Sequence, residues 1–111
     1  MASIFPLVRQ ISWENIPTDF LDSKTIQDYV IEATVDLGLD GLYDPACFSE
    51  TVRQTLEKYN DVPFHNKMHA FGVTMGAYLL LRDYGPLLLT PVEQFGVILA
   101  ALVHDIDHPG L

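Results

Sequence analysis

Apolar side chains recur at helical spacing along most of this chain, and no stretch of its 111 residues sustains the period-two alternation of a half-buried strand. The first clear helix is predicted to begin at Asp22 or Ser23, either of which can cap it, and to run to about Leu37, where Gly38 can stop it. Its apolar stripe consists of Ile26, Val30, Ala33 and Leu37. The pattern therefore predicts an all-α fold.

Two more helices are predicted from local start and stop signals. Asp44-Pro45 is a typical start, because aspartate caps a helix and proline suits its first turn. The apolar stripe of this second helix is Phe48, Val52, Leu56 and Tyr59. A third helix is predicted to begin near His65 or Asn66 and to continue to about Tyr84, where Gly85-Pro86 should end it.

The last predicted helix is the most apolar. Thr90-Pro91-Val92-Glu93 forms a capping box at its start, and residues 95–103 are apolar almost all round, so neighbours must bury them. Residues 1–12 are assigned to an N-terminal segment and residues 13–111 to one helical domain. The early part of the chain is expected to pack over that domain through Phe5, Trp13, Ile16 and Phe20.

Composition narrows the class of protein. Hydrophobic residues make up 49% of the chain, which is enough for a core, and 15 acidic against 6 basic residues give a net charge of −9. That charge argues against nucleic acid or an anionic membrane as the main partner. No apolar run reaches the roughly 20 residues that span a bilayer, and the first residues lack a secretory signal. The single cysteine, Cys47, is expected to be buried and inert, and a cytoplasmic protein is expected.

All four histidines fall into two short clusters. His65 and His69 are four residues apart, so on a helix they would share one face. His104-Asp105-Ile106-Asp107-His108 follows the last apolar run and offers imidazole nitrogens beside carboxylate oxygens, a ligand set that suits zinc with a harder cation nearby. The alternative is that these side chains only make ordinary hydrogen bonds at helix ends. That alternative explains His104 as a helix cap but leaves the second Asp-His pair unexplained.

The two clusters resemble signatures of the class I cyclic nucleotide phosphodiesterases, within the HD superfamily. His65-Asn66-Lys67-Met68-His69 resembles the family's His-Asn-x-x-His motif, and residues 104–110 resemble its His-Asp-x-Asp-His-x-Gly motif. The similarity extends from about Trp13 to the end of the chain, and the flanks agree at Val62-Pro63-Phe64, Ala70-Phe71 and Asp36-Leu37-Gly38-Leu39. The resemblance implies a multi-helix bundle that forms the N-terminal part of a larger helical catalytic domain.

The resemblance also implies roles for single residues. His69, His104 and Asp105 match positions that hold a first metal, expected to be zinc, and Asp105 also reaches toward a second, expected to be magnesium or manganese. His65 matches the general acid that protonates the departing 3′ oxygen of the substrate. Three further residues are expected to support the site: His108 by holding water, Asp107 by orienting ligands or capping backbone groups, and Asn66 as a nearby polar residue.

The family's fourth metal ligand, an aspartate, and its purine-binding glutamine come later and have no counterpart in residues 1–111. The expected activity is therefore that of a longer parent protein: metal-dependent hydrolysis of cAMP, cGMP or both to 5′-nucleotides in signal transduction, with regulatory domains or dimerisation outside this chain. The chain alone is expected to be inactive. Two alternatives remain open, namely another HD-type phosphohydrolase and a non-catalytic helical regulatory module.

Overall fold

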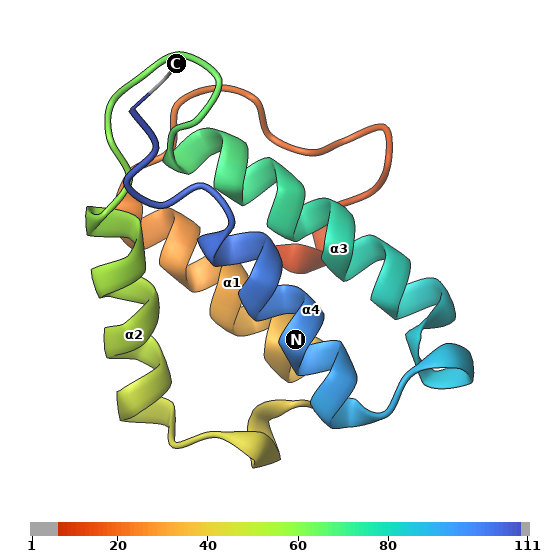
Figure 1. Ribbon diagram of the computed structural model, residues 1–111. Coiled ribbons are helices and arrows are strands. Elements are labelled where there is room, and N and C mark those ends of the chain that lie inside the picture. Colours follow the sequence, from red (N-terminus) through yellow and green to blue (C-terminus); the bar gives the residue numbers. More distant parts are fainter. Residues whose placement is uncertain (1–6, 110–111) are drawn as a thin grey trace.

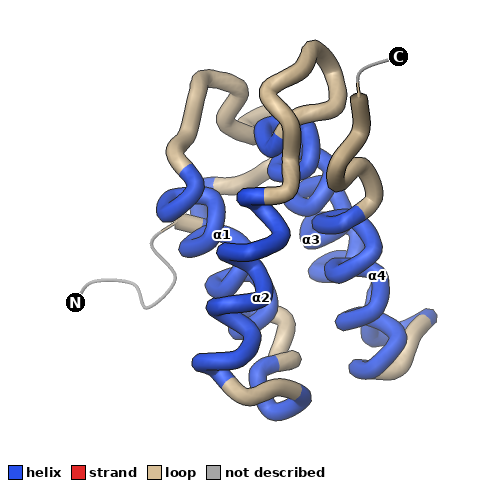
Figure 2. The backbone as a smooth tube through the Cα atoms, turned by 60° about the vertical axis from the view of Figure 1, so that its left-hand side comes forward, coloured by secondary structure: helices blue, strands red, loops and turns tan. Residues whose placement is uncertain are grey.

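The computed structural model describes residues 7–109, in which all regular secondary structure is helical (Figures 1 and 2). The α-helices are α1 (Ser23–Asp36), α2 (Pro45–Glu57), α3 (Lys67–Leu88) and α4 (Pro91–Val103), and two short 3-10 helices are η1 (Val8–Gln10) and η2 (Asp40–Leu42). A short connection joins α3 to α4, which run in opposite directions side by side, and α1 packs on both α2 and α3. The predicted all-α fold is confirmed.

Local capping explains where three of the helices begin. The Asp22 carboxylate accepts a hydrogen bond from the Thr25 amide at 2.8 Å, and the same kind of bond, from Cys47 to Asp44 at 2.9 Å, starts α2. The predicted capping box of α4 is present, since the Thr90 hydroxyl and the Glu93 carboxylate each accept from the other residue's amide. These starts were predictable because each depends on residues within one turn.

The predicted apolar stripes of α1 and α2 meet α3 and α4 in one core. Tyr29 of α1 packs edge-on against Phe71 of α3, with ring centroids 5.0 Å apart. The largest fully buried side chains are Tyr78, Phe71, Ile26, Leu39, Leu56, Met75, Leu79, Ile98, Leu102, Val8, Val30 and Val52. This core holds the start of α3 and the end of α4 at a fixed separation.

The predicted end of the third helix was wrong, because α3 passes through Gly85-Pro86 and ends at Leu88. Proline lacks an amide, but within the last turn this removes only one helical hydrogen bond, and the Leu89 amide still donates to the Gly85 carbonyl at 2.8 Å. Gly85 serves packing instead of termination. A Cβ atom on it would lie 3.0 Å from Oε1 of the buried Gln94, so glycine lets α4 approach α3.

Two expectations about exposure also need correction. The N-terminal segment packs through Val8 and Ile11, while Trp13 and Phe20 are 53% and 74% exposed, and Ile16 is partly buried. Phe5 lies outside the described residues. Cys47 is exposed, because the adjacent Phe48 occupies the buried side of the first turn of α2.

The apolar helix α4 is buried on one side only within residues 7–109. Gln94, Ile98 and Leu102 face the core, whereas Val92 is 67% exposed and Val97 is 38% exposed. The expectation that neighbours bury this helix all round is therefore met on one face. No helix in the described part of the chain is long and apolar enough to cross a membrane.

Candidate metal centre

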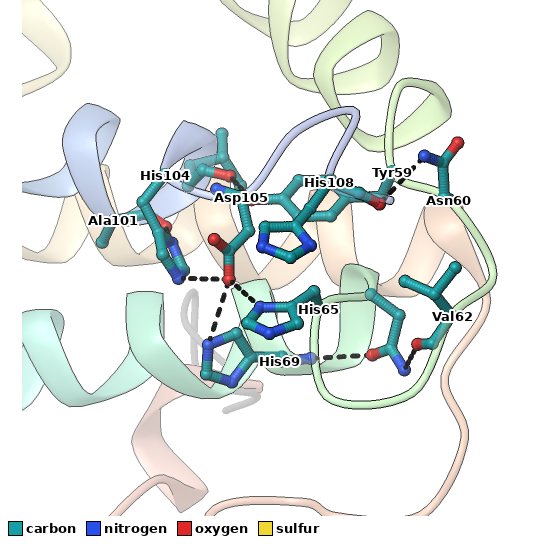
Figure 3. Close-up of polar contacts among 11 residues, drawn as sticks. Tyr59, Asn60, Val62, His65, His69, Ala101, His104, Asp105 and His108 are labelled. Atoms are coloured by element: carbon teal, nitrogen blue, oxygen red, sulfur yellow. Dashed lines mark hydrogen bonds and ion pairs between the residues drawn. The ribbon is translucent and has the colours of Figure 1, made fainter. Parts of the chain in front are cut away.

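The two histidine motifs meet at one end of the bundle. His69 lies in the first turn of α3, and His104 and Asp105 directly follow α4. Because the two helices are antiparallel, the start of α3 lies beside the end of α4, and these side chains meet. His65 approaches from the loop before α3, and His108 from the turn after α4 (Figure 3). The structure thus brings together all four histidines and Asp105, from two segments that are distant in sequence.

Asp105 is the centre of this cluster. Its Oδ2 atom lies 2.9 Å from Nδ1 of His65, 3.1 Å from Nε2 of His104 and 3.5 Å from Nε2 of His69. The carboxylate is 15% exposed. The hydrogen bond from His65 lowers the pKa of Asp105, with the nearby His104 acting in the same direction and partial burial opposing it. Asp105 is therefore anionic at neutral pH and can bind a cation.

Within residues 7–109, two overlapping groups could hold a metal ion. They are His69, His104 and Asp105, and His65, Asp105 and His108, each with ligand atoms within 4.8 Å of one another. The orientation of the rings distinguishes them, because an imidazole nitrogen binds an ion in the plane of its ring. The rings of His69 and His104 are inclined at 62°, so their planes cross. The rings of His65 and His108 are stacked 3.8 Å apart at 14°, so no nearby point lies in both planes.

The first group therefore fits an ion as it stands. Nδ1 of His104 donates to the Ala101 carbonyl at 2.7 Å, which orients the ring so that Nε2 faces Asp105 at 3.1 Å. Two imidazole nitrogens and one carboxylate oxygen form a ligand set typical of zinc with water in the remaining position. In the second group, one of the stacked rings would first have to rotate.

The prediction that His65 and His69 share a helical face was wrong, because His65 precedes the helix. Asn66 is the N-cap of α3: its Oδ1 accepts from the His69 amide at 3.1 Å and its Nδ2 donates to the Val62 carbonyl at 2.9 Å. Phe64 has a left-handed backbone, with φ 66°, which turns the chain just before His65. The two histidines therefore meet through a capped turn, with ring centroids 6.1 Å apart.

Asp107 also acts through its backbone. It has φ 57°, the left-handed region that aspartate tolerates better than most residues, and its amide donates to the Lys58 carbonyl at 2.9 Å. In residues 7–109, Phe64 and Asp107 are the only non-glycine residues with a positive φ. Each immediately precedes one of the stacked histidines.

Two residues that contact the site were missed by the sequence-based interpretation. Tyr59 was assigned only to the apolar stripe of α2, but its hydroxyl donates to the Leu102 carbonyl at 2.6 Å and accepts from the Asp105 amide at 3.3 Å. Asn60, for which no role was predicted from the sequence, donates to the His108 carbonyl at 3.0 Å. A tyrosine at the end of an otherwise aliphatic and aromatic stripe, followed by asparagine, was the available signal, since a partly buried hydroxyl requires a partner.

Comparison with known proteins agrees with this geometry. Residues 64–111 match the family 3′5′-cyclic nucleotide phosphodiesterase. The chain is 47% identical over 62 residues to isoform F of a 3′,5′-cyclic-AMP phosphodiesterase of Drosophila melanogaster, an alignment that covers 51% of this chain and 9% of that protein. It is 39% identical over 54 residues to the cGMP-specific 3′,5′-cGMP phosphodiesterase 3 of Dictyostelium discoideum, covering 48% of this chain and 12% of that protein.

The chain thus spans only 9% and 12% of the length of these two relatives. No solved structure is significantly similar to it. The resemblance indicated by the two histidine motifs is confirmed.

Proposed function

We propose that this chain, whose residues 64–111 belong to the cyclic nucleotide phosphodiesterase family, supplies the metal-binding and proton-donating part of a site that hydrolyses cAMP or cGMP. The convergence of His69, His104 and Asp105 carries the proposal, because the two motifs that match the family meet at one point. The printed names of the relatives, which include a cAMP and a cGMP phosphodiesterase, support the substrate class. Residues 13–111 would then form the N-terminal part of a larger helical catalytic domain.

His69, His104 and Asp105 would hold the first ion, zinc, and the carboxylate of Asp105 would also face a second ion, magnesium or manganese. Bound there, such ions neutralise phosphate oxygens and lower the pKa of a coordinated water. The residues of the chain prepare this environment. Asn66 fixes the backbone of His69 at the start of α3, and the Ala101 carbonyl orients the ring of His104.

His65 is the proposed proton donor. Its Nδ1 bonds to Asp105, which leaves Nε2 for the substrate, and 34% of its side chain is exposed, so a ligand can reach it. As water adds to phosphorus and the bond to the 3′ oxygen breaks, His65 protonates that oxygen, which gives a 3′-hydroxyl and a 5′-phosphate.

A segment exchange tests this proposal. The part of the Drosophila melanogaster cAMP phosphodiesterase that corresponds to residues 64–111 is replaced by residues 64–111 of this chain. The chimera is expected to hydrolyse cAMP within about tenfold of the parent enzyme. His65→Ala in the chimera should lower turnover by about 10²- to 10⁴-fold without loss of zinc, whereas His69→Ala should lower both turnover and zinc content.

Asp83→Asn is the matched control, because Asp83 is an exposed carboxylate on the distant part of α3, paired with Arg82 at 3.2 Å. It should change neither property. A folded chimera that binds zinc but hydrolyses no nucleotide would favour the non-catalytic module. Hydrolysis restricted to non-cyclic nucleotides would favour another HD-type phosphohydrolase.

A further inference from the structure

Three consecutive residues at the end of α2 each bond to the segment that carries His104, Asp105 and His108. We call Lys58, Tyr59 and Asn60 the α2 anchor. The Lys58 carbonyl accepts from the Asp107 amide at 2.9 Å, and the Asn60 side chain donates to the His108 carbonyl at 3.0 Å. Between them, Tyr59 reaches the end of α4. The turn that contains the metal motif is therefore attached to a helix that supplies no ligand of its own.

Tyr59 makes the central contact. Its hydroxyl donates to the Leu102 carbonyl at 2.6 Å, in the last turn of α4, where carbonyls lack helical partners. The same oxygen accepts from the amide of Asp105 at 3.3 Å. One hydroxyl thus joins the helix end to the backbone of the shared ligand. A phenol hydroxyl can donate one hydrogen bond and accept another at the same time, as this geometry requires.

This contact matters because Asp105 lies beyond Val103, the last residue of α4. The turn after α4 contains two backbone bonds of its own, from Ile106 to Val103 and from His108 to Asp105, both at 3.2 Å, and neither of them uses the amide of Asp105. Ligands bind an ion tightly when neighbouring groups already hold them in the binding geometry, and loss of one such group typically lowers metal affinity by about 10- to 100-fold.

We propose that Tyr59 is a positioning residue for the metal ligands, assisted by Asn60, so that the end of α2 sets the affinity of the site for its ion. The inference rests on the proposed function insofar as it assumes the metal site formed by His69, His104 and Asp105. Tyr59 touches neither the ion nor the substrate in this proposal, because its hydroxyl is engaged with backbone groups of residues 102 and 105.

The test compares two tyrosine variants of the 111-residue chain. Tyr59→Phe removes the hydroxyl near the site. Tyr43→Phe is the matched control, because Tyr43 is also partly buried and its hydroxyl lies 2.8 Å from Oγ1 of Thr34, but it sits at the opposite end of α2. Zinc affinity is measured by competition with a chelator, and stability by urea unfolding of the metal-free chain. Tyr59→Phe should weaken zinc binding by about 10-fold or more, and Tyr43→Phe should leave it unchanged.

Equal zinc affinity in the two variants would overturn the proposal. If Tyr59→Phe does not fold, Asn60→Ala provides the second variant, since Asn60 is exposed, and a weakening of about 3-fold or more is expected from it, an effect below that of the central contact. If the unmodified chain binds no zinc, the proposed metal site fails separately. Hydrogen exchange of the Asp105 amide then decides the positioning role: about 10-fold faster exchange in Tyr59→Phe supports it, and unchanged exchange overturns it.

Discussion

The two ends of the α3 and α4 pair are unlike. At one end, where α3 begins and α4 ends, three histidine nitrogens lie within 3.5 Å of a single carboxylate oxygen and the α2 anchor fixes the backbone. We call this the histidine end. At the other end, where a short connection joins α3 to α4, the surface is apolar, and Leu87 and Leu88 are 84% and 75% exposed. We call this the connection end. A groove of about 320 Å³ opens there, lined by Ala77, Leu80, Leu81, Tyr84, Gly85, Leu88, Leu89 and Val97.

The contrast shows that the more apolar end of this helix pair is not the end held by more contacts. The histidine end is polar, yet many of its groups are held by specific bonds to neighbouring elements. The connection end is apolar, yet nothing within residues 7–109 covers Leu87, Leu88 or Val92. The apolar composition of a helix therefore shows how much of its surface could be buried. Which part of that surface is buried depends on the neighbouring elements of the fold.

The largest effect is expected at the histidine end. Asp105→Asn should weaken zinc binding at least about 100-fold, equivalent to about 2.8 kcal/mol, because it removes the negative charge shared by the histidines. Asp83→Asn is the control, since Asp83 is an exposed carboxylate on the distant part of α3, paired with Arg82. Zinc titration of both variants measures the difference. If the two variants lost equal affinity, Asp105 would not be the central ligand and the contrast between the ends would be weakened.

Gly85, at the connection end, provides the next test. Gly85→Ala should lower the free energy of unfolding by about 1 to 3 kcal/mol, because the added Cβ would press on Gln94 at 3.0 Å. Gly72→Ala is the matched control in the same helix, where a Cβ meets nothing within 4 Å, and should raise it by up to about 1 kcal/mol. Urea unfolding distinguishes the two. Stabilisation by Gly85→Ala would show that α4 can move away from α3 without cost.

The apolar surface itself is tested by Leu87→Gln combined with Leu88→Gln. Burial of these side chains between molecules would drive self-association, so the double variant should weaken association at least about 10-fold, or about 1.4 kcal/mol, and reduce hydrophobic-dye binding. Leu42→Gln, at an exposed leucine outside this surface, is the control. Sedimentation measures the association. Unchanged association would mean that the connection end does not drive contact between copies, and altered zinc affinity would show that the two ends communicate.

The sequence predicted features that depend on neighbouring residues in the chain and missed those that depend on distant ones. Asp22, Asp44 and Thr90 cap their helices through bonds that span three residues, so their roles were readable. Gly85 was misinterpreted as a helix stop, because glycine is needed there to make room for Gln94 of α4, which is distant in sequence. The convergence of His69 with Asp105 was predicted from the two clusters of histidine and aspartate and from their resemblance to the family motifs, whereas no local pattern could show the stacking of His65 on His108.

The last prediction concerns Tyr78, which links the middle of α3 to α1, between the two ends. Its hydroxyl donates to Asp36 at 2.5 Å, and burial, reinforced by that carboxylate, raises the pKa of Tyr78 to about 12 from a model-compound value of 10.0. Because the folded state favours the protonated phenol, its contribution to stability is complete below about pH 10 and is lost as the pH rises toward about 12.

The difference in unfolding free energy between the unmodified chain and Tyr78→Phe should therefore be constant from pH 7 to 9 and shrink by pH 11.5. Urea unfolding at each pH measures it. Tyr43→Phe, whose hydroxyl pairs with Thr34, is the control. A difference that stays constant up to pH 11.5 would mean that the Tyr78 phenol titrates alike in the folded and unfolded chain, and that the middle of the helix pair is as open to water as its ends.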